Sequence, residues 1–249
     1  MSQFYSQNGE DRILSRMFSD VGTCVEVGAH DGVYLSNTYH FEERGWQCIL
    51  VEPNGELCAK IRQSRRASVF ECAKSESCGE LILYEGSGED DLYSTLEAPT
   101  PGSPQRFRAV VVQTRTLDSI LEEAGVDSLD FITIDVEGHE SRTLRGLTLS
   151  RWKPRLVLLE DNSDFAEGEV ERHMRHTGYY RFWRSGANDW YAGKSVSRVW
   201  LLSRILFSDC FSLQGFLKGM LPRQPVRKLL LVSRLLRKAR VNSPSEARN

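Results

Sequence analysis

The 249-residue chain lacks the features that define several large classes of protein. Its six cysteines form no CxxC pair and no zinc-type spacing, which argues against structural zinc modules and a disulfide framework. It has no run of roughly eighteen uncharged apolar residues and no basic start followed by an apolar stretch, so neither a membrane-spanning helix nor a secretory signal is expected. With 8 prolines and 19 glycines it is neither low-complexity nor fibrous. These absences predict a cytosolic globular protein with reduced, buried thiols.

The formal net charge is only −2, but the charge is unevenly distributed along the chain. Residues 198–249 contain eleven basic side chains and two acidic ones, a net charge of +9. The other 197 residues carry −11. We therefore expect an acidic body, residues 1–197, joined to a basic tail, residues 198–249, and we expect the two parts to meet different partners.

Apolar segments rich in β-branched residues alternate with segments of helical length. The expected strands are 23–28, 47–53, 67–73, 129–138 and 155–161, and the expected helices include 36–45, 55–64, 116–125 and 166–177. Strands that are apolar on both faces and joined by helices indicate an α/β fold with a mostly parallel sheet between two helical layers. Segment 74–113 breaks this alternation, because two expected strands flank a long polar loop, and it is interpreted as an insertion at the sheet edge.

The turn after the first expected strand is suited to a polar ligand. Gly28 and Gly32 allow positive φ and a close backbone approach there. The third glycine of a dinucleotide fingerprint is absent. Glu26 instead places a carboxylate within the strand, where it can bind the ammonium group of an amino-acid ligand, and this favours S-adenosylmethionine over a nicotinamide cofactor.

Glu52 ends the second expected strand. A carboxylate at this position can accept hydrogen bonds from both ribose hydroxyls of an adenosine. A nicotinamide cofactor would require the same group, so Glu52 predicts a nucleoside cofactor without identifying it. The alternative is that Glu52 only caps the following helix.

Four ionisable residues follow the fourth expected strand within six positions: Asp135, Glu137, His139 and Glu140. They lie where open α/β sheets place their ligand crevice. His139-Glu140 is not followed by the second histidine of HExxH, which argues against zincin chemistry. Glu140 and Arg142 can equally be solvated charges on a helix face.

Carboxylates also end the fifth expected strand, at Glu160 and Asp161, followed by Asn162. Together with Asp135 they could bind a divalent cation such as magnesium. They could equally anchor sugar hydroxyls or take a proton from the methyl acceptor. The sequence leaves these roles open, and with them the metal dependence.

The motifs resemble those of the FkbM family of S-adenosylmethionine-dependent methyltransferases. The similar segments span about residues 5 to 192; they are 5–11, 26–32, 36–38, 45–46, 51–54, 116–118, 134–140 and 186–191. The resemblance implies a Rossmann-like seven-stranded methyltransferase fold and methyl transfer to a hydroxyl, often of a sugar or a polyketide-like product.

The resemblance also implies roles for individual residues. Those that would bind the cofactor are Ser6, Gln7, Glu26, Gly28, Asp31 and Glu52. Those that would face the reacting centre are Asp135, Glu137 and His139, with His139 or a neighbouring carboxylate as the general base. Family members often carry a lysine where this chain has Thr133. If that lysine helps to orient the substrate, the methyl acceptor of this chain is expected to differ from theirs.

The basic tail contains a second candidate functional segment. Residues 226–240 place apolar side chains at three-to-four spacing among lysines and arginines, which predicts a basic amphipathic helix. Such a helix can lie on an anionic membrane surface, placing the protein at the inner face of a membrane. The alternatives are that the tail packs on the body or forms an oligomer contact. Nucleic acid is not expected, because no aromatic-basic binding module accompanies the charge.

Three functions therefore remain open. The first is an O-methyltransferase (EC 2.1.1 class) that modifies a glycan, a glycolipid or a related natural product. The second is a nicotinamide-dependent oxidoreductase, and the third a cofactor-binding module without catalysis. Acceptor specificity is expected in the loop 86–106, the segment 161–169 and the tail.

Overall fold

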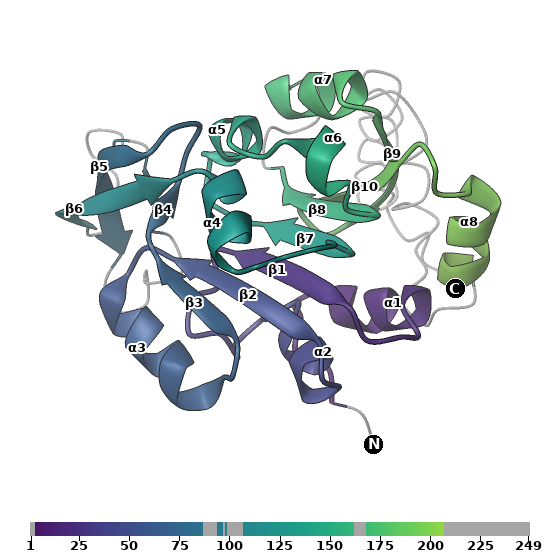
Figure 1. Cartoon of the computed structure of the whole chain (residues 1–249), viewed down its shortest axis with the longest axis horizontal. Helices are drawn as coiled ribbons and strands as arrows, with labels where there is room; N and C mark the ends of the chain where they lie inside the picture. Colours follow the sequence, from purple (N-terminus) through teal and green to yellow (C-terminus); the bar gives the residue numbers. More distant parts are fainter. Residues whose placement is uncertain (1–2, 87–93, 97, 99–106, 162–167, 207–249) are drawn as a thin grey trace, which may run out of the picture.

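A computed structural model describes residues 3–86, 94–96, 98, 107–161 and 168–206 (Figure 1). Within these residues the central feature is a seven-stranded sheet in the order β3-β2-β1-β7-β8-β10-β9, in which only β10 runs against its neighbours. The strands are β1 (Thr23–Val27), β2 (Gln47–Glu52), β3 (Ser68–Glu71), β7 (Phe131–Ile134), β8 (Leu156–Glu160), β9 (Tyr179–Ser185) and β10 (Asn188–Gly193). The predicted α/β fold with a mostly parallel, seven-stranded sheet is therefore confirmed.

Helices cover both faces of this sheet. One face carries α4 (Leu117–Glu123), α5 (Glu140–Arg145), α6 (Leu149–Trp152) and α7 (Glu169–His176). The opposite face carries α1 (Glu10–Met17), α2 (Tyr39–Glu43), α3 (Gly55–Ser64) and α8 (Arg198–Leu206). Successive side chains of a strand point to opposite faces of the sheet. Val25 and Val27 of β1 therefore pack against the first helical layer, whereas Cys24 packs against the second.

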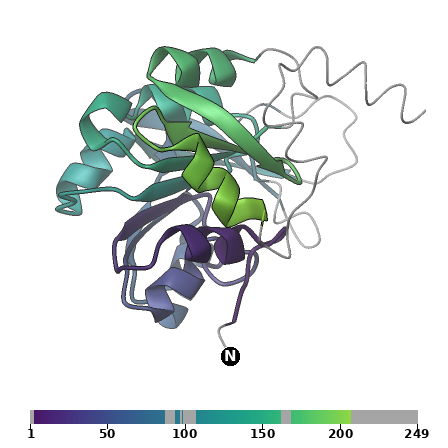
Figure 2. The ribbon, with the colours of Figure 1, turned by 90° about the vertical axis from the view of Figure 1, so that its right-hand side faces the viewer.

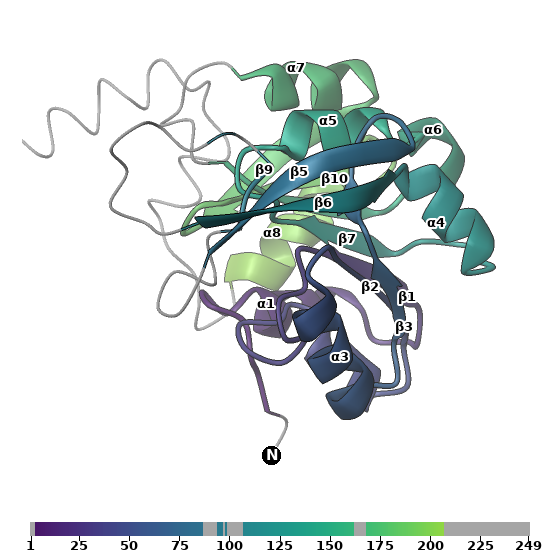
Figure 3. The ribbon, with the colours of Figure 1, turned by 90° about the vertical axis from the view of Figure 1, so that its left-hand side faces the viewer.

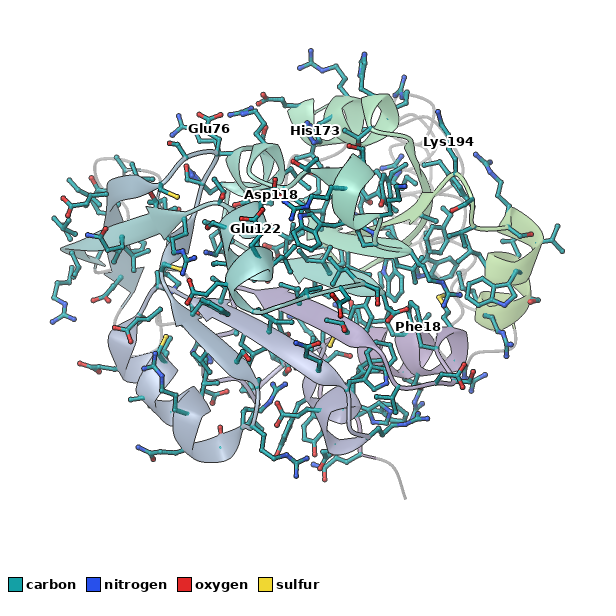
Figure 4. All side chains as sticks on the ribbon, viewed as in Figure 1. Phe18, Glu76, Asp118, Glu122, His173 and Lys194 are labelled. Carbon is teal, nitrogen blue, oxygen red and sulfur yellow. The ribbon has the colours of Figure 1, made fainter. Side chains whose placement is uncertain are left out.

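Aromatic contacts fix α1 and α2 against the sheet. The ring centroids of Phe41 and Phe131 lie 4.9 Å apart, and those of Phe18 and Trp46 lie 5.5 Å apart. Figure 4 labels Phe18 where α1 meets the sheet. Packing of this kind is worth about 0.5–1.5 kcal/mol per aromatic pair beyond the burial of apolar area.

Side-chain capping defines two of the predicted helices. The Asn54 side chain accepts hydrogen bonds from the first amides of α3, and the Thr116 side chain accepts one from Ser119 N (3.2 Å) and so caps α4. Asp118 on α4, labelled in Figure 4, accepts hydrogen bonds from Trp152 Nε1 and Thr148 N, both at 2.8 Å. These bonds tie α6 to α4.

Several predicted boundaries differ from the observed ones. The segment 129–138 is strand only over β7, and the residues after Ile134 form a turn. The segment 67–73 divides into β3 and the short β4 (Ala73–Lys74). Helices α1 and α6 were not expected, because their short apolar patterns lack side-chain caps.

The insertion after β3 forms a sheet of its own. Strand β4 pairs with β6 (Phe107–Arg115), which pairs along its whole length with β5 (Gly79–Gly86). Figure 3 shows this hairpin crossing in front of the seven-stranded sheet. The insertion therefore begins after β3, the edge strand of the seven-stranded sheet, but it adds no strand to that sheet.

The beginning of the basic tail packs on the body. Leu201 and Ile205 of α8 are fully buried against α1, and Figure 2 shows α8 lying across α1. The predicted amphipathic helix 226–240 lies outside the described residues. Within the described part of the chain, no helix is both long and apolar enough to cross a membrane.

Candidate active site

A solvent-open cavity lies at the carboxyl ends of β1, β2, β3 and β7. Its walls include the turn after β1, the residues that follow β3, and the segment after β7. Leu83 of the small sheet, together with Ser94 and Leu96 from the predicted specificity loop, lines another part of it. This is the position at which open α/β sheets bind ligands.

The turn after β1 requires a glycine. Gly28 has φ +79°, and a Cβ on it would lie 1.8 Å from the backbone oxygen of Asp135. Its amide donates to Val51 O at 2.9 Å. The ends of β1, β2 and β7 therefore meet at Gly28, which makes the cavity floor compact.

Glu26 is buried, and its carboxylate is held by the chain that follows β1. It accepts hydrogen bonds from Ser36 Oγ at 2.7 Å, from Thr38 Oγ1 at 2.5 Å and from Asn37 N at 2.6 Å. A carboxylate can accept about four hydrogen bonds, so capacity for one more donor remains in a group that also lines the cavity. Glu26 thus shapes loop 36–38 as well as the cavity wall.

Arg65 supports this arrangement from below. Its side chain is fully buried and pairs with Glu42 at 3.0 Å. It donates to Ser36 Oγ at 3.3 Å and to Thr38 Oγ1 at 3.2 Å, and also to Gly32 O. A single guanidinium therefore ties the glycine turn to the loop that holds Glu26.

Glu52 lies at the cavity wall with each carboxylate oxygen accepting one backbone amide, from His30 and from Asn54, both at 3.0 Å. Burial raises the pKa of Glu52 to about 7, against the opposing effect of these two amides. Asn54, rather than Glu52, caps α3. Each oxygen can accept a further hydrogen bond, which is what two ribose hydroxyls require.

Three predicted cofactor residues do not line the cavity. Asp31 accepts hydrogen bonds from Val33 N and Tyr34 N and so closes the turn. Ser6 is bonded to Asp11 and pairs with Leu35, behind the cavity rim. Gln7 is exposed. The direction of a side chain beyond a turn depends on backbone angles that the sequence does not specify.

Three carboxylates gather at the ends of β7 and β8. One oxygen each from Asp135, Glu137 and Glu160 lies within 4.8 Å of the other two. Desolvation by the surrounding protein, and then the neighbouring Glu160, raises the pKa of Asp135 well above its usual range and that of Glu137 to about 7, although the Asp135 residue itself is exposed at the cavity. Asp135 and Glu137 line the cavity, and Glu137 holds an unusual φ of 48°. The spacing suits a shared proton, a sugar diol or a cation equally well.

His139 is not brought to the cavity. It is buried and precedes α5 as its N-cap residue, and it is not among the lining residues. The neighbouring Glu140 accepts a hydrogen bond from Gly138 N at 3.0 Å, which closes the turn after β7. The carboxylates therefore reach the cavity while the histidine does not.

Two lining residues were not anticipated. Cys72 and Lys74 follow β3 and line the cavity, with Lys74 Nζ donating to Cys72 Sγ at 3.0 Å. Cys72 and Lys74 are two positions apart, and in extended chain this spacing places two side chains on the same face. It was the one signal in the sequence that the two residues lie together. Nothing in the sequence indicated that this face is the cavity, because the small sheet that folds over it could not be predicted.

A model of the methyltransferase FkbM domain matches residues 26–181, which include the carboxyl end of β1 and the whole of β2, β3 and β7. The chain belongs to the FkbM methyltransferase family. It is therefore an S-adenosylmethionine-dependent methyltransferase, and membership decides against the nicotinamide alternative. The chain is also 26% identical over 174 residues to the 2-O-methyltransferase NoeI of Sinorhizobium fredii, covering 64% of this chain and 71% of that protein.

Two solved methyltransferases are similar in outline to this FkbM member. A TehB-like S-adenosylmethionine-dependent methyltransferase from Corynebacterium glutamicum has a TM-score of 0.43 and 9% identity, covering 77% of this chain and 89% of that one. A precorrin-6y C5,15-methyltransferase from Geobacter metallireducens has a TM-score of 0.38 and 13% identity, covering 74% and 86%.

The cavity fits the cofactor of the family. Glu52 offers one free acceptor position on each oxygen, and Glu26 retains capacity for a cationic donor. These two carboxylates stand at the ends of adjacent strands, so they can hold opposite ends of one ligand.

Proposed function

We propose that this FkbM protein transfers a methyl group to a hydroxyl of a glycan, a glycolipid or a related natural product. The carboxylate cluster of Asp135, Glu137 and Glu160 beside the cofactor cavity carries the proposal. Carboxylates at that position can bind hydroxyls and accept a proton. The name of the relative NoeI, a 2-O-methyltransferase, supports oxygen as the acceptor atom.

The cofactor-binding roles follow from the geometry of the first two strands. Glu52 would hold the ribose hydroxyls and Glu26 the ammonium group, with Gly28 keeping the turn close to the ligand. When bound, S-adenosylmethionine supplies an electrophilic methyl group on a sulfonium. Asp135 and Glu137 would orient the acceptor hydroxyl and take its proton, because a pKa near 7 leaves Glu137 partly ionised at neutral pH.

Calorimetric titration with S-adenosylhomocysteine tests the cofactor site. We expect micromolar binding by the unaltered protein, loss of that binding in Glu52→Ala, and no binding of NADH. Glu56→Ala is the control, because Glu56 is exposed on the first turn of α3. Unchanged binding in Glu52→Ala would contradict the assignment of this residue.

Radiolabelled methyl transfer to hydroxylated glycans and glycolipids tests the cluster. We expect Asp135→Asn and Glu137→Gln to lower kcat by about 10²–10⁴-fold while leaving S-adenosylhomocysteine binding intact. Glu140→Gln, next to the cluster but outside the cavity lining, is the control. Loss of activity in EDTA that magnesium restores would assign the cluster to a cation instead.

A second proposal concerns the partner of the tail. The charge of +9 over residues 198–249 and the apolar spacing of 226–240 support binding to an anionic membrane surface. A surface-bound enzyme would meet a lipid-linked acceptor. Vesicle binding, described in the Discussion, tests this partner separately from catalysis.

A further inference from the structure

A buried lysine stands in the cavity wall. Lys74 is only 2% exposed, and no carboxylate of the described residues forms an ion pair with it. Its hydrogen-bond partner is the thiol of Cys72, itself 3% exposed, with Nζ and Sγ 3.0 Å apart. Burying an ammonium group without a counter-charge is costly, so this contact is an unusual use of a lysine.

The environment makes this amine reactive. Burial lowers the pKa of Lys74 to about 8, so an appreciable fraction of the amine is neutral near pH 7.5. A neutral amine is a nucleophile, whereas an ammonium group is not. The backbone also fixes the pair, because Lys74 is held in β4 by pairing with Arg115 of β6.

We infer that Cys72 and Lys74 form an oxidation-dependent covalent link in the wall of the cofactor cavity. Hydrogen peroxide, a small oxidant that the solvent-open cavity admits, converts the Cys72 thiol to a sulfenic acid and is reduced to water. The Lys74 amine then attacks the sulfur. An N–S bond forms, the S–O bond breaks, and the hydroxyl group leaves as water with one amine proton. The pair loses two hydrogens in all, and a thiol reductant reverses the link.

The link would change the cavity in two ways. It removes the ammonium charge of Lys74 and fixes two side chains that line the same cavity as Glu52, whose backbone oxygen accepts a hydrogen bond from Cys72 N at 3.1 Å. Both changes act on the cofactor cavity, so oxidised protein should bind S-adenosylhomocysteine about tenfold more weakly. This inference needs only the cavity and the cofactor class, and it is independent of the acceptor proposed above.

Peptide mass spectrometry of the full-length protein tests the link. Cleavage after glutamate releases residues 72–76, which contain this pair and no other cysteine. After peroxide treatment we expect this peptide to lose two hydrogens, and we expect trypsin to stop cutting after Lys74. Dithiothreitol should restore both the mass and the cleavage.

Two variants and one control separate the link from ordinary thiol oxidation. Cys72→Ser and Lys74→Arg should both abolish the mass change, since a guanidinium keeps the charge but is not a comparable nucleophile. Cys78→Ser removes an exposed cysteine and should leave the link intact. Gain of two or three oxygens on Cys72, with normal cleavage after Lys74, would overturn the inference. A link that forms without weakening cofactor binding would overturn its regulatory part.

Discussion

Individual buried charges organise the cofactor end of the cavity. Glu26 and Glu52 were expected there from the sequence, because the carboxyl ends of parallel strands meet at one edge of a sheet. The role of Arg65, which ties the glycine turn to the loop that holds Glu26, was not expected from the sequence. Arg65 follows α3, where basic residues are usual, and its tertiary partners Glu42 and Ser36 precede it by more than twenty residues.

The contacts of Arg65 predict that replacing this one side chain strongly lowers the stability of the protein. We expect Arg65→Met to lower the free energy of unfolding by about 3–5 kcal/mol, because it leaves the buried carboxylate of Glu42 without its buried counter-charge. It should also weaken S-adenosylhomocysteine binding by releasing the loop that holds Glu26. Urea unfolding and calorimetry measure the two effects. Arg62→Met, at an exposed ion pair with Glu71, should cost less than about 1 kcal/mol.

The raised pKa of Glu52 predicts a pH dependence of stability. Unfolding restores the ordinary pKa of 4.5, so the unfolded state binds fewer protons between that pH and about 7. The contribution of Glu52 to stability is therefore present below about pH 4.5 and lost as the pH rises through about 7, by at most about 3 kcal/mol. Thermal unfolding from pH 5 to 8 should show a smaller decline for Glu52→Gln than for the unaltered protein. Parallel declines would contradict the shift.

The elements of the fold were more predictable than the directions of side chains. Alternating apolar strands and helices predicted the parallel sheet, and the expected helix 116–125 contains α4. The turn that shortens β7 was missed because the apolar run continues through Val136, whereas Glu137 adopts φ 48°. The same turn sends Asp135 and Glu137 into the cavity and His139 into the core, an outcome that spacing alone does not distinguish.

Two glycines with positive φ, Gly28 after β1 and Gly45 after α2, give a matched pair of substitutions. Gly45 at the end of α2 has φ +87° and open space around its Cβ position, so Gly45→Ala should cost only the left-handed penalty of about 1–2 kcal/mol. Gly28→Ala adds a clash with the backbone of Asp135 and should cost more and abolish cofactor binding. Equal losses of stability in the two variants would show that the close approach at Gly28 is unimportant.

Helix α8 gives a similar comparison. Leu201→Ala should lower the free energy of unfolding by about 2–5 kcal/mol, because Leu201 is fully buried against α1. Val199, on the same helix, is 78% exposed, so Val199→Ala should change the free energy of unfolding by no more than about 0.5 kcal/mol. Denaturant unfolding compares them. A mild effect of Leu201→Ala would mean that α8 belongs to the tail rather than to the body.

At the scale of the whole molecule, the uneven charge predicts a surface interaction. Full-length protein should sediment with vesicles containing phosphatidylserine and be released by high salt, since each basic residue near such a surface contributes about 1 kcal/mol. A chain ending at residue 206 should remain in the supernatant while binding S-adenosylhomocysteine normally. Equal sedimentation of both chains, or binding to neutral vesicles, would contradict a role for the tail.

The two ends of the body are joined directly, with a consequence for how the protein is made. Glu10, which begins α1, accepts hydrogen bonds from Ser185 Oγ at 2.7 Å and from Asn188 Nδ2 at 3.0 Å. The first of these spans 175 positions of chain. A ribosome must therefore synthesise nearly the whole body before α1 can complete these bonds. The part of the apolar face of α1 that packs on Leu201 and Ile205 is covered later still, and until then the nascent chain is open to chaperones.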